Sequence, residues 1–119
     1  MKELTKAEEQ IMQVIWDNEE ILIKDVIDHL PEPRPAYNTV GTFMKILESK
    51  GFVSRRKIAN TFIYSQVIEK KVYTKKFMNG ILGRYFDDSV ENLLSFMVDE
   101  KKLDLKQVEA LIKKRKGND

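Results

Sequence analysis

All three prolines of this 119-residue chain fall within five positions, at Pro31, Pro33 and Pro35. Proline lacks a backbone N–H and fixes its own φ angle, and it disfavours the helical conformation in the residue before it. No helix can therefore run through residues 31–35. The segments on either side, both of which show helical periodicity, are expected to form separate helices joined by a short, stiff connection.

The segment before the prolines predicts two helices with a β-prone run between them. Thr5 and Glu8 have the spacing of a capping box, so a first helix is expected to begin there and to end near Asp17. Residues 20–23 are long enough for one edge strand, and a second short helix should follow. The expected core positions of the two helices are Ala7, Ile11, Val14 and Ile15, then Ile23, Val26, Ile27 and Leu30.

A third helix is expected after the prolines, over about residues 36–50, with Gly51 placed for a left-handed C-terminal cap. Its buried stripe should be Val40, Phe43 and Leu47, with Met44 at the margin. The opposite face is small and hydrogen-bonding, and it carries Asn38, Gly41, Thr42, Lys45 and Ser49. A glycine inside a helix costs roughly 1 kcal/mol relative to alanine. Either close approach to a partner or tight packing against another helix would explain it.

Two β-prone segments come next, residues 52–57 and 62–67, with residues 58–61 between them. They predict a hairpin in which Asn60 takes a positive φ. The first strand ends in three cations, Arg55, Arg56 and Lys57.

The net charge of +2 conceals an uneven distribution along the chain. Residues 1–32 carry three cations and nine anions, whereas residues 33–57 carry six cations and one anion. A concentrated basic block is typical of a polyanion-binding face. An ordinary solvated surface with chance clustering of charge would also fit this distribution.

The order helix, short strand, helix, tight turn, helix, hairpin is that of a winged helix-turn-helix domain, so the predicted fold is mainly α with a small β-hairpin wing. In this arrangement the third helix enters the DNA major groove and the wing flanks it. The predicted DNA-binding residues are Tyr37, Asn38, Thr39, Gly41, Thr42 and Lys45 on the helix, with Arg55, Arg56 and Lys57 on the wing. A winged-helix module that binds a protein instead of DNA is the alternative.

Residues 68–119 are predicted to form a separate C-terminal helical region beside the DNA-binding domain of residues 1–67. This region shows apolar stripes on short helices that cannot make a good core alone. The stripes are expected to pair with a second copy of the chain, although folding back onto the first domain is the alternative. The expected dimerisation residues are Phe77, Ile81, Val90, Leu93, Leu94, Met97, Val108, Leu111 and Ile112.

Several other functions have little support in the sequence. The chain has no cysteine, no apolar segment of the ~20 residues that a membrane helix needs, and a charged start without a secretory signal, so a cytoplasmic location is expected. His29 stands alone, which indicates a surface or capping histidine and not a metal ligand. Asp87 and Asp88 precede a helix start, and residues 113–116 suit a frayed basic tail. No enzyme activity and no cofactor are expected.

Four short stretches carry a resemblance to a known family. They are Leu4-Thr5-x-Ala7-Glu8, Val14-x-Trp16, Ala36-Tyr-Asn-Thr-Val40 and Lys50-Gly51-Phe52-Val53, and Tyr64-Ser65 also fits. They resemble the BlaI/MecI/CopY family of penicillinase repressors over nearly the whole chain. The resemblance implies a winged-helix repressor that dimerises through its C-terminal helices and binds a palindromic operator. It implies DNA contacts at Asn38, Thr39, Gly41 and Thr42, and Gly41 stands where some members carry an arginine.

The resemblance also implies a route of induction. Repressors of the penicillinase type are inactivated by cleavage in the dimerisation region, downstream of a membrane-bound sensor metalloprotease. The bond falls at an Asn-Phe pair in those members, and the matching pair here is Ser95-Phe96. The copper-responsive branch carries a C-terminal cysteine cluster, so copper sensing is not expected of this cysteine-free chain.

Overall fold

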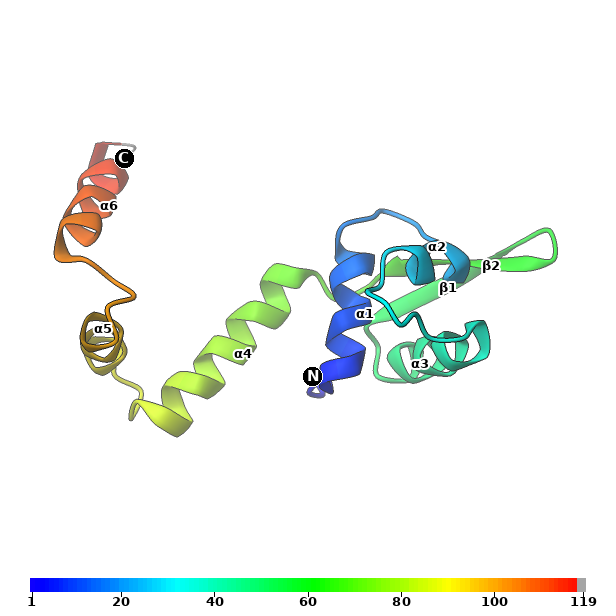
Figure 1. Cartoon of the computed structure of the whole chain (residues 1–119), viewed down its shortest axis with the longest axis horizontal. Helices are drawn as coiled ribbons and strands as arrows, with labels where there is room; N and C mark the ends of the chain where they lie inside the picture. The colour runs from blue at the N-terminus through cyan, green and yellow to red at the C-terminus, as the bar shows by residue number, and fades with distance from the viewer. Residues whose placement is uncertain (118–119) are drawn as a thin grey trace. The chain divides into compact units, whose positions relative to one another are not determined.

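The structure of the protein, a computed structural model, describes residues 1–117 and divides the chain into two compact units (Figure 1). The first unit comprises Met1–Tyr73, and the second begins at Thr74.

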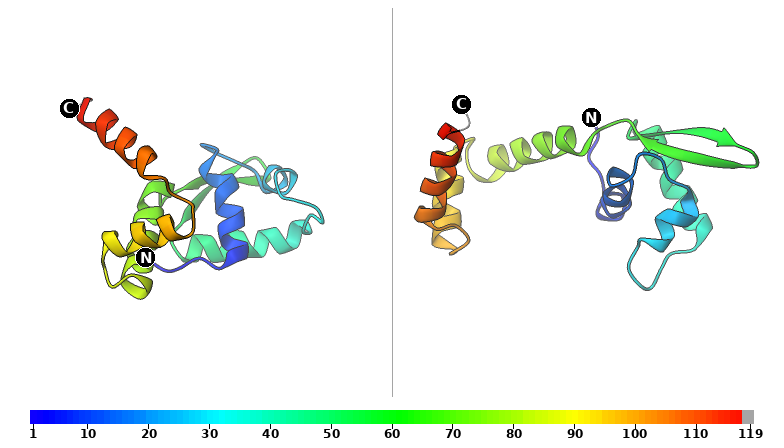
Figure 2. Two further views of the ribbon diagram at one scale, coloured as in Figure 1. Left: turned by 60° about the vertical axis from the view of Figure 1, so that its left-hand side comes forward. Right: turned by 90° about the horizontal axis from the view of Figure 1, so that it is seen from above.

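The first unit contains three helices followed by a two-stranded antiparallel hairpin (Figures 1 and 2). The helices are α1 (Lys6–Trp16), α2 (Ile23–Asp28) and α3 (Tyr37–Ser49), and the strands are β1 (Val53–Ile58) and β2 (Thr61–Gln66). The capping box at the start of α1 is confirmed, because the Thr5 hydroxyl accepts from the Glu8 N–H while the Glu8 carboxylate accepts from the Thr5 N–H. The mainly helical fold with a hairpin wing is thus the predicted one.

Gly51 ends α3 in the expected way. It has a φ of 82° and donates its N–H to the carbonyl of Glu48, while the N–H of Phe52 donates to the carbonyl of Leu47. This pair of hydrogen bonds is a Schellman motif, which needs a left-handed residue at the position of Gly51. The chain therefore turns sharply from α3 into β1 with the last carbonyls of the helix satisfied.

The hairpin differs from the sequence prediction at its turn. Ile58 pairs with Thr61, so only Ala59 and Asn60 form the loop, and Ala59 takes the positive φ, at 52°. The prediction of Asn60 was wrong because the strand register decides which residue occupies the first loop position. The burial of Val53 and Tyr64 fixes that register. The expected strand at residues 20–23 is reduced to a single bridge between Ile21 and Tyr64.

The core of the first unit lies between α1, α2, α3 and the base of the hairpin. One expected core position was wrong, because Ala7 is exposed. Ile27 and Phe43 are half-buried and pack against the core, whereas Met44, expected at the margin, is fully buried. The buried residues of α1 are Glu8, Ile11, Met12, Val14 and Ile15. The fully buried side chains are Phe52, Met12, Ile15, Met44, Leu47, Val26 and Val40.

The first unit also includes the start of α4 (Lys70–Tyr85). Tyr73 is 7% exposed, and its ring lies 5.8 Å from that of Trp16 and 5.6 Å from that of Phe52. The indole N–H of Trp16 donates to the carbonyl of Ile68 at 2.9 Å. The chain beyond residue 67 therefore closes one side of this core.

The second unit contains the rest of α4 with α5 (Val90–Asp99) and α6 (Leu105–Gly117). No side chain of α5 or α6 is buried among the residues that the structure describes. Ser89 caps α5 by accepting from the N–H of Asn92, while Asp87 and Asp88 adopt left-handed conformations in the preceding turn. The basic run 113–116 lies within α6, so the expected frayed tail is helical. Across residues 1–117, no helix is long and apolar enough to cross a membrane.

Candidate nucleic-acid interface

The outward face of α3 brings together the helix residues predicted to contact DNA. Asn38, Thr39, Thr42 and Lys45 are exposed, Tyr37 is 53% exposed at the start of the helix, and Gly41 is half-buried. The only acid in the sequence of α3, Glu48, is turned toward the wing and is paired there. The exposed face is therefore polar and carries no negative charge.

The inward face of α3 holds the helix in place. Val40, Met44 and Leu47 recur at intervals of four and three residues, and all three are fully buried against the rest of the first unit. Because these side chains are packed on one side and the Schellman motif fixes the end of the helix, the outward face is presented on a rigid support.

Two side chains of the outward face differ in their hydrogen bonding. The Thr42 hydroxyl donates to the backbone carbonyl of Asn38 at 3.1 Å, so its proton is already engaged within the helix. What Thr42 offers a partner is its methyl group and the remaining acceptor capacity of its oxygen. The Asn38 side-chain amide, by contrast, has no hydrogen-bond partner among residues 1–117 and can both donate and accept.

The three wing cations are not equivalent. Arg55 pairs with Glu48 at 3.3 Å and lies 4.1 Å above the ring of Phe62. Arg56 makes a bidentate pair with Glu20, at 2.9 and 3.1 Å, and this hydrogen bonding and charge raise the pKa of Arg56 further above its ordinary value. Lys57 is exposed, and within the described part of the chain no carboxylate pairs with it.

The other cations of the basic block are also divided between paired and unpaired. Lys50 donates to the buried carboxylate of Glu8 at 2.6 Å and to the carbonyl of Glu3, so it belongs to the interior of the first unit. Arg34 lies 3.8 Å from Glu32 and donates to the carbonyl of Leu30. Of the six cations in residues 33–57, only Lys45 and Lys57 have no ion pair within residues 1–117. Four of the six cations in this block are therefore already paired with a carboxylate, so fewer are free to neutralise phosphates than the sequence indicates.

Sequence reasoning did not find these pairings, because each partner lies on another element. Glu8 and Lys50 are 42 positions apart, and Glu20 and Arg56 are 36 positions apart. One local signal was available: a glutamate in a capping box lies close to the helix start and is held there. It did not reveal which cation meets it.

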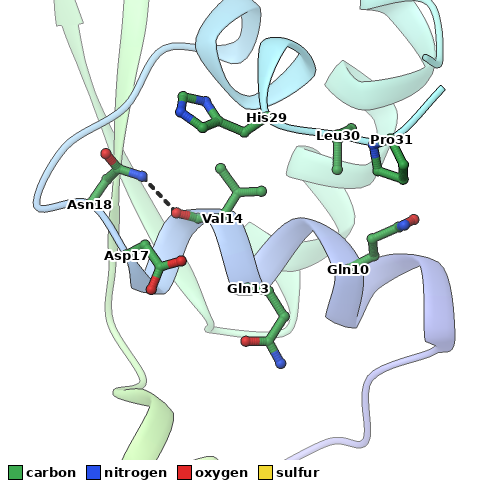
Figure 3. Close-up of a pocket in the computed structure, with 8 residues that line it drawn as sticks. All are labelled: Gln10, Gln13, Val14, Asp17, Asn18, His29, Leu30 and Pro31. Carbon is green, nitrogen blue, oxygen red and sulfur yellow. Dashed lines mark hydrogen bonds between the residues drawn. The ribbon is translucent and has the colours of Figure 1, made fainter.

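A hollow in the first unit lies between α1 and the end of α2 and has a volume of about 330 Å³ (Figure 3). His29, the C-cap residue of α2, borders it with Nδ1 2.7 Å from the carbonyl of Asp25. The side-chain amide of Asn18 donates to the carbonyl of Val14. The residues around it are Gln10, Gln13, Val14, Asp17, Asn18, His29, Leu30 and Pro31. In the described residues no group of three or more histidine, aspartate or glutamate side chains is arranged to hold a metal ion.

The protein has three helices followed by an antiparallel hairpin, and the third helix presents an exposed polar face. This arrangement defines a winged-helix DNA-binding protein. The model of the family described as "Penicillinase repressor" matches residues 4–116, and the chain belongs to that family of DNA-binding transcriptional repressors, which are not enzymes.

Two relatives and a solved structure agree with this assignment. The methicillin resistance regulatory protein MecI of Mammaliicoccus sciuri is 23% identical over 110 residues, which cover 92% of this chain and 89% of that protein. The penicillinase repressor of Bacillus licheniformis is 22% identical, with 92% and 86% covered. Among solved structures, the DNA-binding domain of the repressor BlaI is 28% identical with a TM-score of 0.52, over 61% of this chain and 94% of that domain. A possible transcriptional regulator for arsenical resistance shares the fold at 15% identity, with a TM-score of 0.51 over 71% of this chain and 90% of its own.

Proposed function

We propose that this repressor acts as a homodimer on a palindromic operator, with the outward face of α3 in the major groove and Lys57 of the wing on a flanking phosphate. The observation that carries the proposal is the exposed, acid-free face of α3 on a rigidly packed helix. Asn38, Thr39 and Thr42 are of the types that contact base edges or phosphates, and Lys45 can reach either. Tyr37, which is exposed at the start of the helix, can donate its hydroxyl to a phosphate.

The ion pairs within the protein predict which cations contribute most to DNA binding. A cation that neutralises a phosphate on binding releases a counterion, and the salt dependence of binding then steepens by about one unit of slope. Within residues 1–117, Lys45 and Lys57 have no ion pair that DNA binding would have to break. Arg55 and Arg56 would first have to leave Glu48 and Glu20, so their net contribution should be smaller.

We therefore expect Lys45→Ala and Lys57→Ala each to reduce the slope of log Kd against log salt by about one unit, and Arg56→Ala to reduce it by less. The measurement is fluorescence anisotropy with DNA from the region upstream of the protein's own gene, across a salt series. Lys6→Ala on α1 is the matched control, and it should leave the slope unchanged. Binding that is indifferent to both salt and sequence would contradict the proposal.

Dimerisation is supported by the apolar side chains that the second unit leaves exposed. Val90 and Leu111 are each 56% exposed, Ile112 is 50% exposed and Phe77 is 41% exposed. Leu94 is 39% exposed, and Ile81, Leu93, Met97 and Val108 are half-buried. Apolar faces of this kind are covered in soluble proteins, and a second copy of the same helices is self-complementary. A two-fold dimer would place two α3 helices about 34–36 Å apart, one turn of DNA.

Analytical ultracentrifugation at micromolar concentration is expected to show about twice the 14.0 kDa mass of one chain. Leu111→Glu should shift the protein to a monomer, because it places a charge on the apolar side of α6. Ala110→Glu adds the same charge to a neighbouring exposed position on the polar side and should leave the dimer intact. A 14.0 kDa species for the unmodified chain would contradict dimerisation.

Proteolytic inactivation at Ser95-Phe96 is part of the same proposal. Both residues lie inside α5, and the ring of Phe96 packs edge-on against that of Phe86 at 5.5 Å. A protease needs its substrate in an open conformation, so this bond becomes available only when α5 unfolds locally. Within a single chain α5 has no buried side chain, so the contacts with the second copy are the interactions that such opening would have to break. Cleavage there would remove α6 and half of α5 from the dimerisation surface.

A further inference from the structure

Gly41 is the feature of α3 that the folded chain itself does not explain. It lies inside the helix, where glycine destabilises the folded state relative to alanine. A glycine is required at such a position when it adopts a left-handed conformation or when a neighbour leaves no room for a Cβ. Among the glycines of residues 1–117, it is Gly51 that has a positive φ.

Packing within the chain does not require Gly41 either. Among residues 1–117, a Cβ built on Gly41 meets no heavy atom within 4 Å beyond the local helix backbone, so an alanine side chain would stand in open space. The sequence left two explanations open, an external partner or tight packing against another helix. This geometry removes the second, so close approach to an external partner is the explanation that remains.

We propose that Gly41 admits the 5-methyl group of a thymine in the DNA major groove, so that α3 selects an A·T pair at that position. This inference rests on the proposed DNA binding by the outward face of α3. The thymine methyl is the apolar group that the major-groove edges of the bases present. Without a Cβ, the helix backbone can approach that methyl group directly.

The neighbours of Gly41 on the same face suit this assignment. Thr42, whose hydroxyl proton is bound to the carbonyl of Asn38, offers a methyl group to the same apolar contact. Asn38 lies one helical turn before Gly41 and Thr42, and its side-chain amide has no partner within the described residues. Asparagine pairs in a bidentate manner with N6 and N7 of adenine, so it can read an A·T pair beside the thymine methyl.

The packing of the inward face of α3 makes the contact between α3 and DNA sensitive to one methyl group added at position 41. Val40, Met44 and Leu47 have no exposed surface, so the helix cannot move back from the DNA without disturbing the core. With an alanine at position 41, either the DNA would have to shift or the close contact between the helix backbone and the thymine methyl group would be lost.

The test begins by selecting preferred sites from random DNA with the full-length protein. Each thymine of the selected half-site is then replaced by uracil, which lacks only the 5-methyl group, and Kd is measured by fluorescence anisotropy. For the unmodified protein, uracil at one thymine should weaken binding about 3- to 10-fold. Gly41→Ala should weaken binding to the thymine site at least about 10-fold, and this loss should shrink when the same position carries uracil.

The Gly41→Ala variant also provides its own control for folding. Gly41→Ala should raise the Tm by about 4 °C, so weaker binding cannot be assigned to unfolding. Gly117→Ala in α6, where a Cβ also meets nothing within 4 Å, is the matched substitution and should leave the response to uracil unchanged.

Two outcomes would overturn the inference while leaving DNA binding intact. In the first, Gly41→Ala binds the selected sites as tightly as the unmodified protein. In the second, it weakens thymine and uracil sites equally, so that the two changes act independently. Failure to select any preferred site would instead overturn the proposed function on which the inference rests.

Discussion

Replacing Lys50 by methionine is expected to lower the free energy of unfolding of the first unit by about 3 kcal/mol, because removal of one partner from a buried ion pair leaves an uncompensated charge. The stranded group is the carboxylate of Glu8, a residue that is 3% exposed and accepts from Lys50 at 2.6 Å. Urea unfolding followed by the fluorescence of Trp16, the single tryptophan of the chain, measures the loss.

Two further variants make this expectation specific. Adding Glu8→Gln to Lys50→Met removes the buried charge and should recover part of the lost stability. Arg56→Met breaks the exposed pair with Glu20 and should change stability little. Equal effects of Lys50→Met and Arg56→Met would contradict a special role for the buried pair.

The same pair gives the first unit a defined dependence on pH. Burial raises the pKa of Glu8, but the hydrogen bond from Lys50, the backbone N–H of Thr5 and the charge of Lys50 together lower that pKa below its ordinary value of 4.5. The carboxylate therefore stabilises the fold fully above that ordinary value, and the stabilisation is lost as the pH falls through the lower pKa of the folded state. The decline in stability on acidification should be shallower in Glu8→Gln.

Tyr73→Ala is expected to cost the first unit about 3–5 kcal/mol, the usual price of removing a large aromatic ring from a core. Tyr73 packs against both Trp16 and Phe52 and is 7% exposed, although it lies in α4 beyond the hairpin. Urea unfolding and the near-ultraviolet circular dichroism of the aromatic cluster measure the effect.

Tyr73→Phe keeps the ring and removes only the oxygen that accepts from the Leu4 N–H at 3.3 Å, so it should cost much less. Tyr85→Ala removes a tyrosine from the same helix, but that side chain is 71% exposed and the change should be nearly silent. If Tyr73→Ala were as mild as Tyr85→Ala, the winged-helix unit would end before α4.

The sequence was most informative where the determining interactions are local. The capping box at Thr5, the prolines between α2 and α3, and the C-terminal cap at Gly51 each act within a few residues, and the structure has helix ends close to the expected positions. The outward face of α3 followed from helical periodicity alone. The choice between the adjacent residues Phe43 and Met44 did not, because they lie 100° apart on the helix and their burial depends on the neighbouring elements.

Electrostatic pairing was the part that the sequence concealed. A count of cations along the chain assigns the same weight to Lys50 and Lys57, yet one is committed to the buried Glu8 and the other is exposed without an ion pair in the described chain. The partner of each cation is set by the tertiary fold, over separations of tens of residues. The candidate site could therefore be located from the sequence, but the sequence could not show which of its cations are paired with carboxylates and which are not.

The pairing of Arg56 with Glu20 and of Arg55 with Glu48 also bears on how the repressor would be distributed in a cell. Attraction to bulk chromosomal DNA depends almost entirely on counterions released by cations, whereas an operator also offers base edges. A wing whose two arginines are already paired should be held more weakly by the excess of random sequence than a wing with free arginines. More molecules of the repressor then remain available to the operator, so effective occupancy requires fewer copies of the protein.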